Sequence, residues 1–304
     1  MASFLLYLGY FLAGYTALTL FFYMLSAIVP KSAFVARALA SYLSLIISSL
    51  YGVAIWFVLR ASGRQQLVQW AVARSFKFLM GLSTGVTFEI EDPKGHLESV
   101  RPAVFIGNHQ TELDVLMLGC MFPKYCSVTA KASLKKVPFL GWFMAISGSV
   151  FLDRSNSKGA RQALQGAVDE IRNKRQSVYI FPEGTRSYAK EPTLLPFKKG
   201  AFHLAVQAQV PIVPVVVANY SHVLSIKDLT FKAGKIPCKV LDPIPTTGLT
   251  AADVDELTRS TRDLMLKELY ALTEKARGRP VTKIGADGGS DVAKATGTDV
   301  KRTA

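Results

Sequence analysis

The distribution of apolar and charged positions separates an apolar N-terminal part of the chain from a mixed remainder. No charged side chain occurs in residues 1–30, and a second uncharged run extends from Ala38 to Leu59. At a rise of about 1.5 Å per residue, either run forms a helix long enough to cross a bilayer. Lys31 and Arg37 lie in the linker between the runs. We therefore predict two N-terminal membrane helices over residues 1–62.

The way in which these helices enter the membrane has more than one interpretation. A cleaved signal peptide is disfavoured because the first run lacks a basic n-region and is too long for an h-region. Basic residues are more numerous after the second run than in the linker, with Arg60, Arg64, Arg74 and Lys77 close behind it. This asymmetry predicts that the chain from residue 60 onward is cytoplasmic, with the N-terminus on the same side. A shallow hairpin that never crosses has the same pattern and stays an alternative.

A third helical pattern follows at residues 63–84. Its apolar positions are Leu67, Trp70, Val72, Phe76 and Leu79, with Arg74 and Lys77 between them. The pattern is typical of a basic amphipathic helix at the membrane interface. It is equally typical of a helix that packs one face on a protein core.

From about residue 85 the pattern changes to short β-rich runs separated by helical patterns. The β-rich runs are VTFEIE, AVFIG, CSVTA, SVFLD, SVYIF and PIVPVVVA. Helical periodicity predicts helices over residues 159–174, 201–209 and 253–275. This alternation indicates an α/β domain with a largely parallel sheet, over residues 85–276. Residues 277–304 have no periodicity, and we predict a disordered basic tail there.

Composition and charge narrow the class of partner. The chain has 304 residues and a net charge of +14, with a mean hydropathy of +0.25. This balance favours an anionic lipid surface or a phosphorylated substrate. Nucleic acid is not expected as a partner, because the aromatic residues lie mainly in the apolar runs. The three cysteines form no CxxC pair, which favours a reducing compartment without disulfides.

Polar residues interrupt the apolar stretch FIGNHQTELDVLML, residues 105–118. His109 and Asp114 are five residues apart and would not share a face of a regular helix. A bend between strand and helix would let Asp114 bind one ring nitrogen of His109 and leave the other as a base. Such a dyad lacks a serine, so the substrate would have to bring the hydroxyl. The alternative is a histidine that only caps the helix and pairs with an acid.

Two further turns follow strands and contain anion-binding residue types. GSVFLDR ends in Arg154, whose planar fork suits a phosphate at the carboxyl end of a strand. FPEGTRS contains Gly184, Thr185 and Arg186, which could form an anion nest. Lys131 adds positive charge nearby. The alternatives are surface arginines paired with neighbouring acids and solvated lysines.

A metal site is not expected from the histidine pattern. The histidines His96, His109, His203 and His222 are scattered, with no H-x3-H spacing. We therefore expect neither a metal nor another cofactor.

Four blocks in order resemble the lysophosphatidic acid acyltransferases, the 1-acyl-sn-glycerol-3-phosphate O-acyltransferases. NHQTELD resembles the family's N-H-x4-D block, GSVFLDR its G-x-x-F-x-x-R block, FPEGTRS its E-G-T-R-S block, and VPIVPVVV its Pro-containing block. The resemblance covers roughly residues 85–245. The sequences of the blocks are most similar to those of the fungal family members that are located at the endoplasmic reticulum. It implies the glycerolipid acyltransferase fold, with a mostly parallel sheet flanked by helices after an N-terminal membrane hairpin.

The resemblance also implies an activity and roles for single residues. It implies acyl transfer from acyl-CoA, as co-substrate, to the sn-2 hydroxyl of lysophosphatidic acid, which gives phosphatidic acid. His109 is then the general base and Asp114 orients it. Glycerol-phosphate binding is carried over to Arg154, Gly184, Thr185 and Arg186, with Glu183 as a brace of that turn and Lys131 as a second-rank phosphate or CoA contact. Acyl transfer also needs N–H donors that stabilise the oxyanion of the tetrahedral intermediate. We expect the helix N-terminus after Gln110 to supply them.

Several alternatives stay open at this point. The acceptor could be lysophosphatidylinositol or lysocardiolipin, or the chain could be a non-catalytic lipid-binding relative. The implied location is the endoplasmic reticulum membrane with a cytoplasmic catalytic domain, and lipid droplets are a second location. Trp142, Phe143 and Met144 could line an acyl tunnel or simply pack in the core. The sequence does not predict an oligomeric state.

Overall fold

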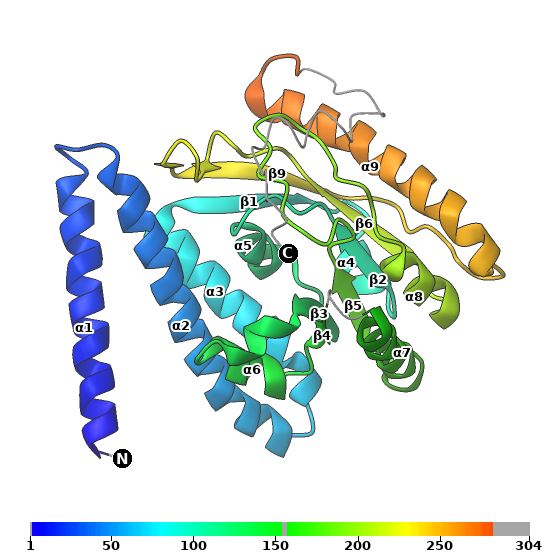
Figure 1. Cartoon of the computed structure of the whole chain (residues 1–304), viewed down its shortest axis with the longest axis horizontal. Helices are drawn as coiled ribbons and strands as arrows, with labels where there is room; N and C mark the ends of the chain where they lie inside the picture. Colours follow the sequence, from blue (N-terminus) through cyan, green and yellow to red (C-terminus); the bar gives the residue numbers. More distant parts are fainter. Residues whose placement is uncertain (1, 154–156, 282–304) are drawn as a thin grey trace, which may run out of the picture.

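The computed structural model describes residues 2–153 and 157–281, and Figure 1 shows a twisted central sheet with helices on both faces. The sheet has seven strands in the order β1-β9-β6-β2-β5-β3-β4. The strands are β1 (Val86–Glu91), β2 (Val104–Gly107), β3 (Cys126–Lys131), β4 (Val150–Leu152), β5 (Ser177–Ile180), β6 (Ile212–Val217) and β9 (Gly234–Val240). A separate hairpin pairs β7 (Leu224–Ser225) with β8 (Thr230–Phe231). The predicted mixed α/β fold with a mostly parallel sheet is confirmed.

Strand directions decide where the functional turns meet. The strands β2, β3, β4, β5 and β6 run parallel to their neighbours in this group, whereas β9 is antiparallel to β6 and parallel to β1. Val104 of β2 pairs with Val178 of β5 on one side and Ile212 of β6 on the other. The segments that leave β2, β5 and β6 therefore emerge side by side at one edge of the sheet, where α/β sheets bind ligands.

Helices cover both faces of the sheet (Figure 1). One face carries α5 (Asp114–Met121) with α3 (Val68–Thr84) behind it, and the other carries α7 (Ser157–Lys174), α8 (Gly200–Ala208) and α9 (Val254–Arg277). The short helices are α4 (His96–Ser99) and α6 (Leu140–Ile146), and 3-10 turns occupy Gln65–Leu67, Ala132–Lys136 and Ala251–Asp253. The three predicted helices after residue 150 correspond to α7, α8 and α9.

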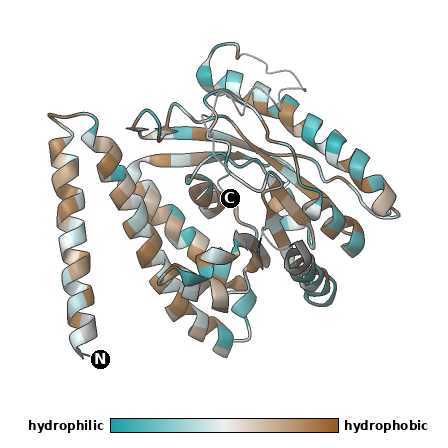
Figure 2. Ribbon diagram, viewed as in Figure 1, coloured by the Kyte–Doolittle hydropathy of each residue, from teal (hydrophilic) through white to brown (hydrophobic). Residues whose placement is uncertain are grey.

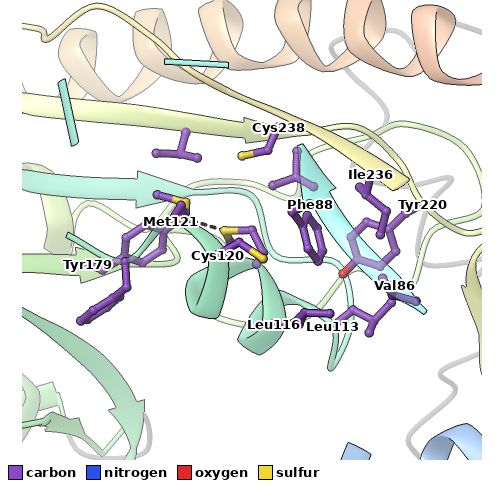
Figure 3. Close-up of a cluster of buried hydrophobic side chains, with 14 of the residues drawn as sticks. Val86, Phe88, Leu113, Leu116, Cys120, Met121, Tyr179, Tyr220, Ile236 and Cys238 are labelled. Carbon is purple, nitrogen blue, oxygen red and sulfur yellow. Dashed lines mark hydrogen bonds between the residues drawn. The ribbon is translucent and has the colours of Figure 1, made fainter. Parts of the chain in front are cut away.

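Each face of the sheet has its own apolar core. On the α5 face, Figure 3 shows Leu113, Leu116 and Met121 beside side chains of β1 and β9. On the other face, Ile106 and Val216 pack against Phe202 of α8. Because β6 is buried along its whole length, its sequence IVPVVV is continuously apolar rather than alternating.

Helix α3 packs into the protein along one face. Val72, Phe76 and Met80 are buried, as expected for a core-facing helix, while Phe78 and Leu82 are exposed. Arg74 donates hydrogen bonds to the carbonyl oxygens of Gly119, Cys120 and Phe122, where α5 ends. This places a cation at the negative end of the α5 dipole. Contact of α3 with the membrane interface stays a prediction.

The two N-terminal helices are α1 (Ala2–Leu25) and α2 (Ser32–Ala61), and both are long and apolar enough to cross a membrane. Figure 2 shows their largely hydrophobic surfaces, and α1 stands at the edge of the molecule. Helix α2 packs through small residues such as Ala36, Ala40 and Gly52. Its Arg37 donates to the carbonyl oxygens of Thr84 and Phe231. Helix α2 is therefore fixed to the α/β domain.

Two features of the fold differ from the sequence prediction. Strand β9 was not predicted, because Pro237 and Gly234 interrupt its apolar pattern. The C-terminal helix extends to Arg277 and ends at Gly278, whose positive φ of 63° suits a glycine. Residues 282–304 lie outside the described part of the chain, so the predicted disordered tail at residues 277–304 stays a prediction.

Candidate active site

The turn after β2 is fastened to the end of β6 by side-chain amides. The Asn108 side chain donates to the carbonyl oxygen of Val217 and accepts from the N–H of the same residue. The Gln110 amide donates to the carbonyl oxygens of Val217 and Ala218. Both amide side chains are buried, so the position of the turn between them, which contains His109, is fixed.

His109 and Asp114 meet across the predicted bend. The Nδ1 atom of His109 lies 2.7 Å from Oδ2 of Asp114, which is the first residue of α5. The same carboxylate oxygen accepts from the backbone N–H groups of Gln110 at 2.6 Å and Thr111 at 3.2 Å. Helix α5 begins later than expected because this carboxylate holds the preceding residues in a loop. The Nε2 atom of His109 has no hydrogen-bond partner among the described residues.

The segment after β5 supports the His109 ring and backbone. The Phe181 ring stacks on the imidazole with centroids 4.1 Å apart and an interplanar angle of 18°. The Glu183 carboxylate accepts from the backbone N–H of His109 at 2.6 Å and of Leu195 at 2.9 Å. Burial raises the pKa of Glu183 to about 8, and these two N–H donors offset part of that effect. Both oxygens of Glu183 thus bind the protein backbone, so a substrate contact through them stays a prediction.

Gly184 and Lys198 form the next part of this segment. Gly184 has a φ of +70°, in the left-handed region that favours glycine. A Cβ atom built there would lie 2.9 Å from Cε of Lys198, so the lysine side chain lies directly over the turn. Thr185 is exposed beside it. Positive charge and small residues therefore coincide here, as an anion-binding turn requires.

Arg186 has one end of its guanidinium engaged and one end open. Its Nη1 atom donates to Oε1 of Glu112 at 2.7 Å and to the hydroxyl of Tyr188 at 3.1 Å. The Tyr188 hydroxyl donates to the same Glu112 oxygen. The Nε and Nη2 atoms of Arg186 have no partner in the described part of the chain. The open edge is the bidentate fork that suits a phosphate.

The remaining predicted residues are less closely connected to this cluster. Lys131 is exposed at the carboxyl end of β3, which is separated from β2 by β5. Arg154 lies outside the described residues. The functional role of every predicted site residue stays a prediction, while the structure brings together His109, Asp114, Glu183, Gly184, Thr185 and Arg186 at the edge shared by β2 and β5.

Phe181 and Tyr220 are among the residues of the site that were not predicted from the sequence. Phe181 stacks on His109, and the hydroxyl of Tyr220 donates to Oδ1 of Asp114 at 2.7 Å. Both follow strands that end at this edge. Inspecting the first few residues after each predicted strand could have found them.

The hydrogen bonds of the turn show which backbone N–H groups are free to act as oxyanion donors. The N–H groups of Gln110 and Thr111 already bind Asp114, and the N–H of Leu113 binds the Thr111 hydroxyl. Of the backbone N–H groups of residues 111–113, that of Glu112 alone makes no hydrogen bond within the described structure. That the helix N-terminus after Gln110 supplies oxyanion donors stays a prediction, and the N–H of Glu112 is the candidate within this turn.

The arrangement of these side chains suits proton transfer. Among the described residues, no group of three or more His, Cys, Asp or Glu side chains could hold a metal ion. A histidine with one nitrogen on a carboxylate and the other open can accept a proton from a substrate hydroxyl. The neighbouring cationic turn can bind an anion. These are the elements of a group transferase that acts on an anionic alcohol.

Comparisons with known proteins define the class. Residues 90–218 match the acyltransferase family. The chain is 42% identical to the 1-acyl-sn-glycerol-3-phosphate acyltransferase of Saccharomyces cerevisiae over 80% of both chains. It is 41% identical to the human 1-acyl-sn-glycerol-3-phosphate acyltransferase beta, over 66% of this chain and 70% of that protein. The chain therefore belongs to the 1-acyl-sn-glycerol-3-phosphate acyltransferase family, as its four sequence blocks predict.

A solved structure agrees on the fold. The 1-acyl-sn-glycerophosphate acyltransferase PlsC from Thermotoga maritima aligns with a TM-score of 0.60 over 84% of this chain and 96% of that chain. The two sequences are 22% identical, so this likeness concerns the fold alone.

Proposed function

We propose that this acyltransferase moves an acyl chain from acyl-CoA to the sn-2 hydroxyl of lysophosphatidic acid and releases phosphatidic acid and CoA. The observation that supports this proposal best is the 2.7 Å contact between His109 and Asp114, which leaves Nε2 of His109 open. The names of the relatives support lysophosphatidic acid as acceptor.

The proposed reaction is one direct transfer. Nε2 of His109 removes the proton of the acceptor hydroxyl as its oxygen attacks the thioester carbon. The C–O bond forms, the C–S bond breaks, and the imidazolium returns the proton to the CoA thiolate. Base catalysis of this kind contributes about 10²–10⁴-fold. Asp114 orients the imidazole and stabilises its protonated form, and the N–H of Glu112 is the candidate oxyanion donor.

The phosphate of the acceptor binds the cationic turn. The open edge of Arg186 and the turn at Gly184 and Thr185 are its proposed contacts, with Arg154 and Lys131 as further ones. These contacts give affinity and position, because the phosphate does not change charge during the transfer.

The proposed location is the cytoplasmic side of the endoplasmic reticulum membrane, with lipid droplets as a second location. Exposed apolar residues on α1, such as Tyr7, Phe21 and Met24, support contact with lipid. Helix α2 packs against α3 and, through Gly52, against Phe143 of α6. These contacts favour a hairpin that enters one leaflet over a pair of full spans. A helix α2 that crossed the whole bilayer could not at the same time pack against α3 and α6 of the catalytic domain.

An acceptor panel tests the proposed function. Purified protein in lipid vesicles would receive radiolabelled acyl-CoA with lysophosphatidic acid, lysophosphatidylinositol or monolysocardiolipin. We expect the highest kcat/KM with lysophosphatidic acid and product labelled at sn-2. Preference for another acceptor would overturn the substrate assignment but keep the acyltransferase, whereas no transfer to any of them would favour a non-catalytic lipid binder.

A further inference from the structure

Tyr220 is completely buried where the chain leaves β6. Its hydroxyl lies 2.7 Å from Oδ1 of Asp114, the carboxylate oxygen that does not face His109. The backbone N–H and the hydroxyl of Thr111 also lie within 3.1 Å and 3.0 Å of the Tyr220 oxygen. Since an ionised carboxylate only accepts, Tyr220 donates its single proton to Asp114 and accepts both contacts from Thr111.

We propose that Tyr220 is a positioning residue for the reaction, which fixes and polarises Asp114 and thereby holds His109 in the orientation needed for proton removal. This inference rests on the proposed function, in which His109 is the base. It extends the His109–Asp114 pair into a chain of three side chains from three segments, the turn after β2, helix α5 and the exit of β6. Tyr220 does not touch the reacting atoms.

The geometry explains why this position needs a phenol. The His109 ring, Gln110 N–H and Thr111 N–H all approach Oδ2 of Asp114. Without Tyr220, Oδ1 would be a buried carboxylate oxygen with no donor, a costly state. Burial, followed by the charge of Asp114, raises the pKa of Tyr220 well above 10, so the phenol keeps its proton.

A second buried tyrosine provides a matched control. Tyr179 is also completely buried, and Figure 3 shows both tyrosines in the same apolar cluster. The Tyr179 hydroxyl contacts the sulfur of Met117 at 4.0 Å and does not reach Asp114 by a hydrogen bond. Tyr179→Phe and Tyr220→Phe therefore remove the same group from the same core, and only the second change removes a donor to the dyad.

The experiment compares the two variants as full-length protein in vesicles, with kcat, both KM values and the pH profile of kcat/KM. We expect Tyr220→Phe to lower kcat about 10- to 100-fold, as the loss of a hydrogen bond to a charged group would. KM should change little. The acidic limb of the profile should move relative to the wild type, because the carboxylate that holds the base loses a hydrogen bond. Tyr179→Phe should match the wild type.

Equal kcat and equal pH profiles for the two variants would overturn the role of Tyr220, whether both were active or both impaired. Asp114→Asn in the same assay separates this failure from failure of the proposed function, because wild-type activity of Asp114→Asn would overturn the dyad itself. If Tyr220→Phe does not fold, Thr111→Val removes the neighbouring hydroxyl instead. It should lower kcat about 3-fold and move the same limb, and an unchanged profile would contradict the proposal.

Discussion

Two charged pairs, His109–Asp114 and Arg186–Glu112, lie where the chain leaves β2 and β5 but differ in how their charges are satisfied. Asp114 is 1% exposed and receives hydrogen bonds from His109, Gln110, Thr111 and Tyr220. Arg186 and its partner Glu112 have side chains that are each 39% exposed. The Asp114 carboxylate is buried and saturated, whereas the Arg186–Glu112 ion pair is half-exposed and leaves donors of Arg186 unused.

This difference matches the two tasks that the proposed function requires. Proton transfer needs a base held in one orientation, and buried hydrogen bonds supply that rigidity. Substrate binding needs groups that can exchange a protein partner for a ligand, and a half-exposed ion pair is weak enough to do so. We therefore expect changes at the buried His109–Asp114 pair to affect kcat and changes at the half-exposed Arg186–Glu112 pair to affect KM.

Asp114→Asn should produce the largest effect among the tests of this comparison. The amide cannot stabilise the imidazolium, and its NH2 group would face N–H donors. We expect kcat to fall about 10³–10⁴-fold with little change in KM. Steady-state kinetics with both substrates measures this, and a loss expressed mainly in KM would contradict the separate roles of the two charged pairs.

Arg186→Ala should have the second largest effect. Loss of the open guanidinium edge should raise KM for lysophosphatidic acid about 10- to 100-fold, and KM for acyl-CoA far less. Arg172→Ala is a suitable control, because Arg172 of α7 donates to the carbonyl oxygen of Gln207 in α8 and is not among the proposed phosphate contacts. The reverse pattern of KM values would assign Arg186 to CoA.

Glu112→Gln should have a smaller effect in the opposite direction. Under the proposed function, the Glu112 carboxylate would compete with an incoming phosphate for Arg186 and repel it, while the half-exposed pair contributes little stability. We expect KM for lysophosphatidic acid to fall about 2- to 5-fold at unchanged kcat. A higher KM would indicate that Glu112 orients Arg186 instead of competing for it.

Glu183 predicts a pH effect on stability. Its pKa is raised by burial from 4.5 to about 8, so the folded protein binds this proton more tightly than the unfolded chain does. The contribution of Glu183 to the free energy of unfolding is fully present below its pKa in the unfolded chain. It decreases by up to about 1.4 kcal/mol per pH unit as pH rises, until pH passes the pKa in the folded protein. Thermal unfolding from about pH 5 to about pH 9 should show the wild type losing stability relative to Glu183→Gln. Parallel curves would contradict the raised pKa.

Local patterns predicted most of the elements and the centre of the site. The apolar runs became α1 and α2, and the short β-rich runs became strands of one sheet. The five-residue spacing of His109 and Asp114 correctly required a bend, because no regular helix brings the two side chains together.

The features that were missed depend on contacts between distant segments. Strand β9 pairs with β1, with Val86 opposite Gly234, and its proline conceals the strand pattern. Tyr220 lies 106 residues from Asp114 and looks like an ordinary residue after a strand. Glu112 showed no sign of an ion pair with Arg186, which is 74 residues away. These contacts exist only because parallel strands bring their carboxyl ends to one edge.

The most direct test of the central claim is acyl transfer from acyl-CoA to lysophosphatidic acid by purified His109→Ala. His203→Ala is the matched control, because His203 lies in α8 away from the dyad. The account predicts that His109→Ala stays membrane-bound and folded but loses transfer by at least about 10²-fold, while His203→Ala retains wild-type kcat. Substantial residual transfer by folded His109→Ala would contradict the assignment of His109 as the base.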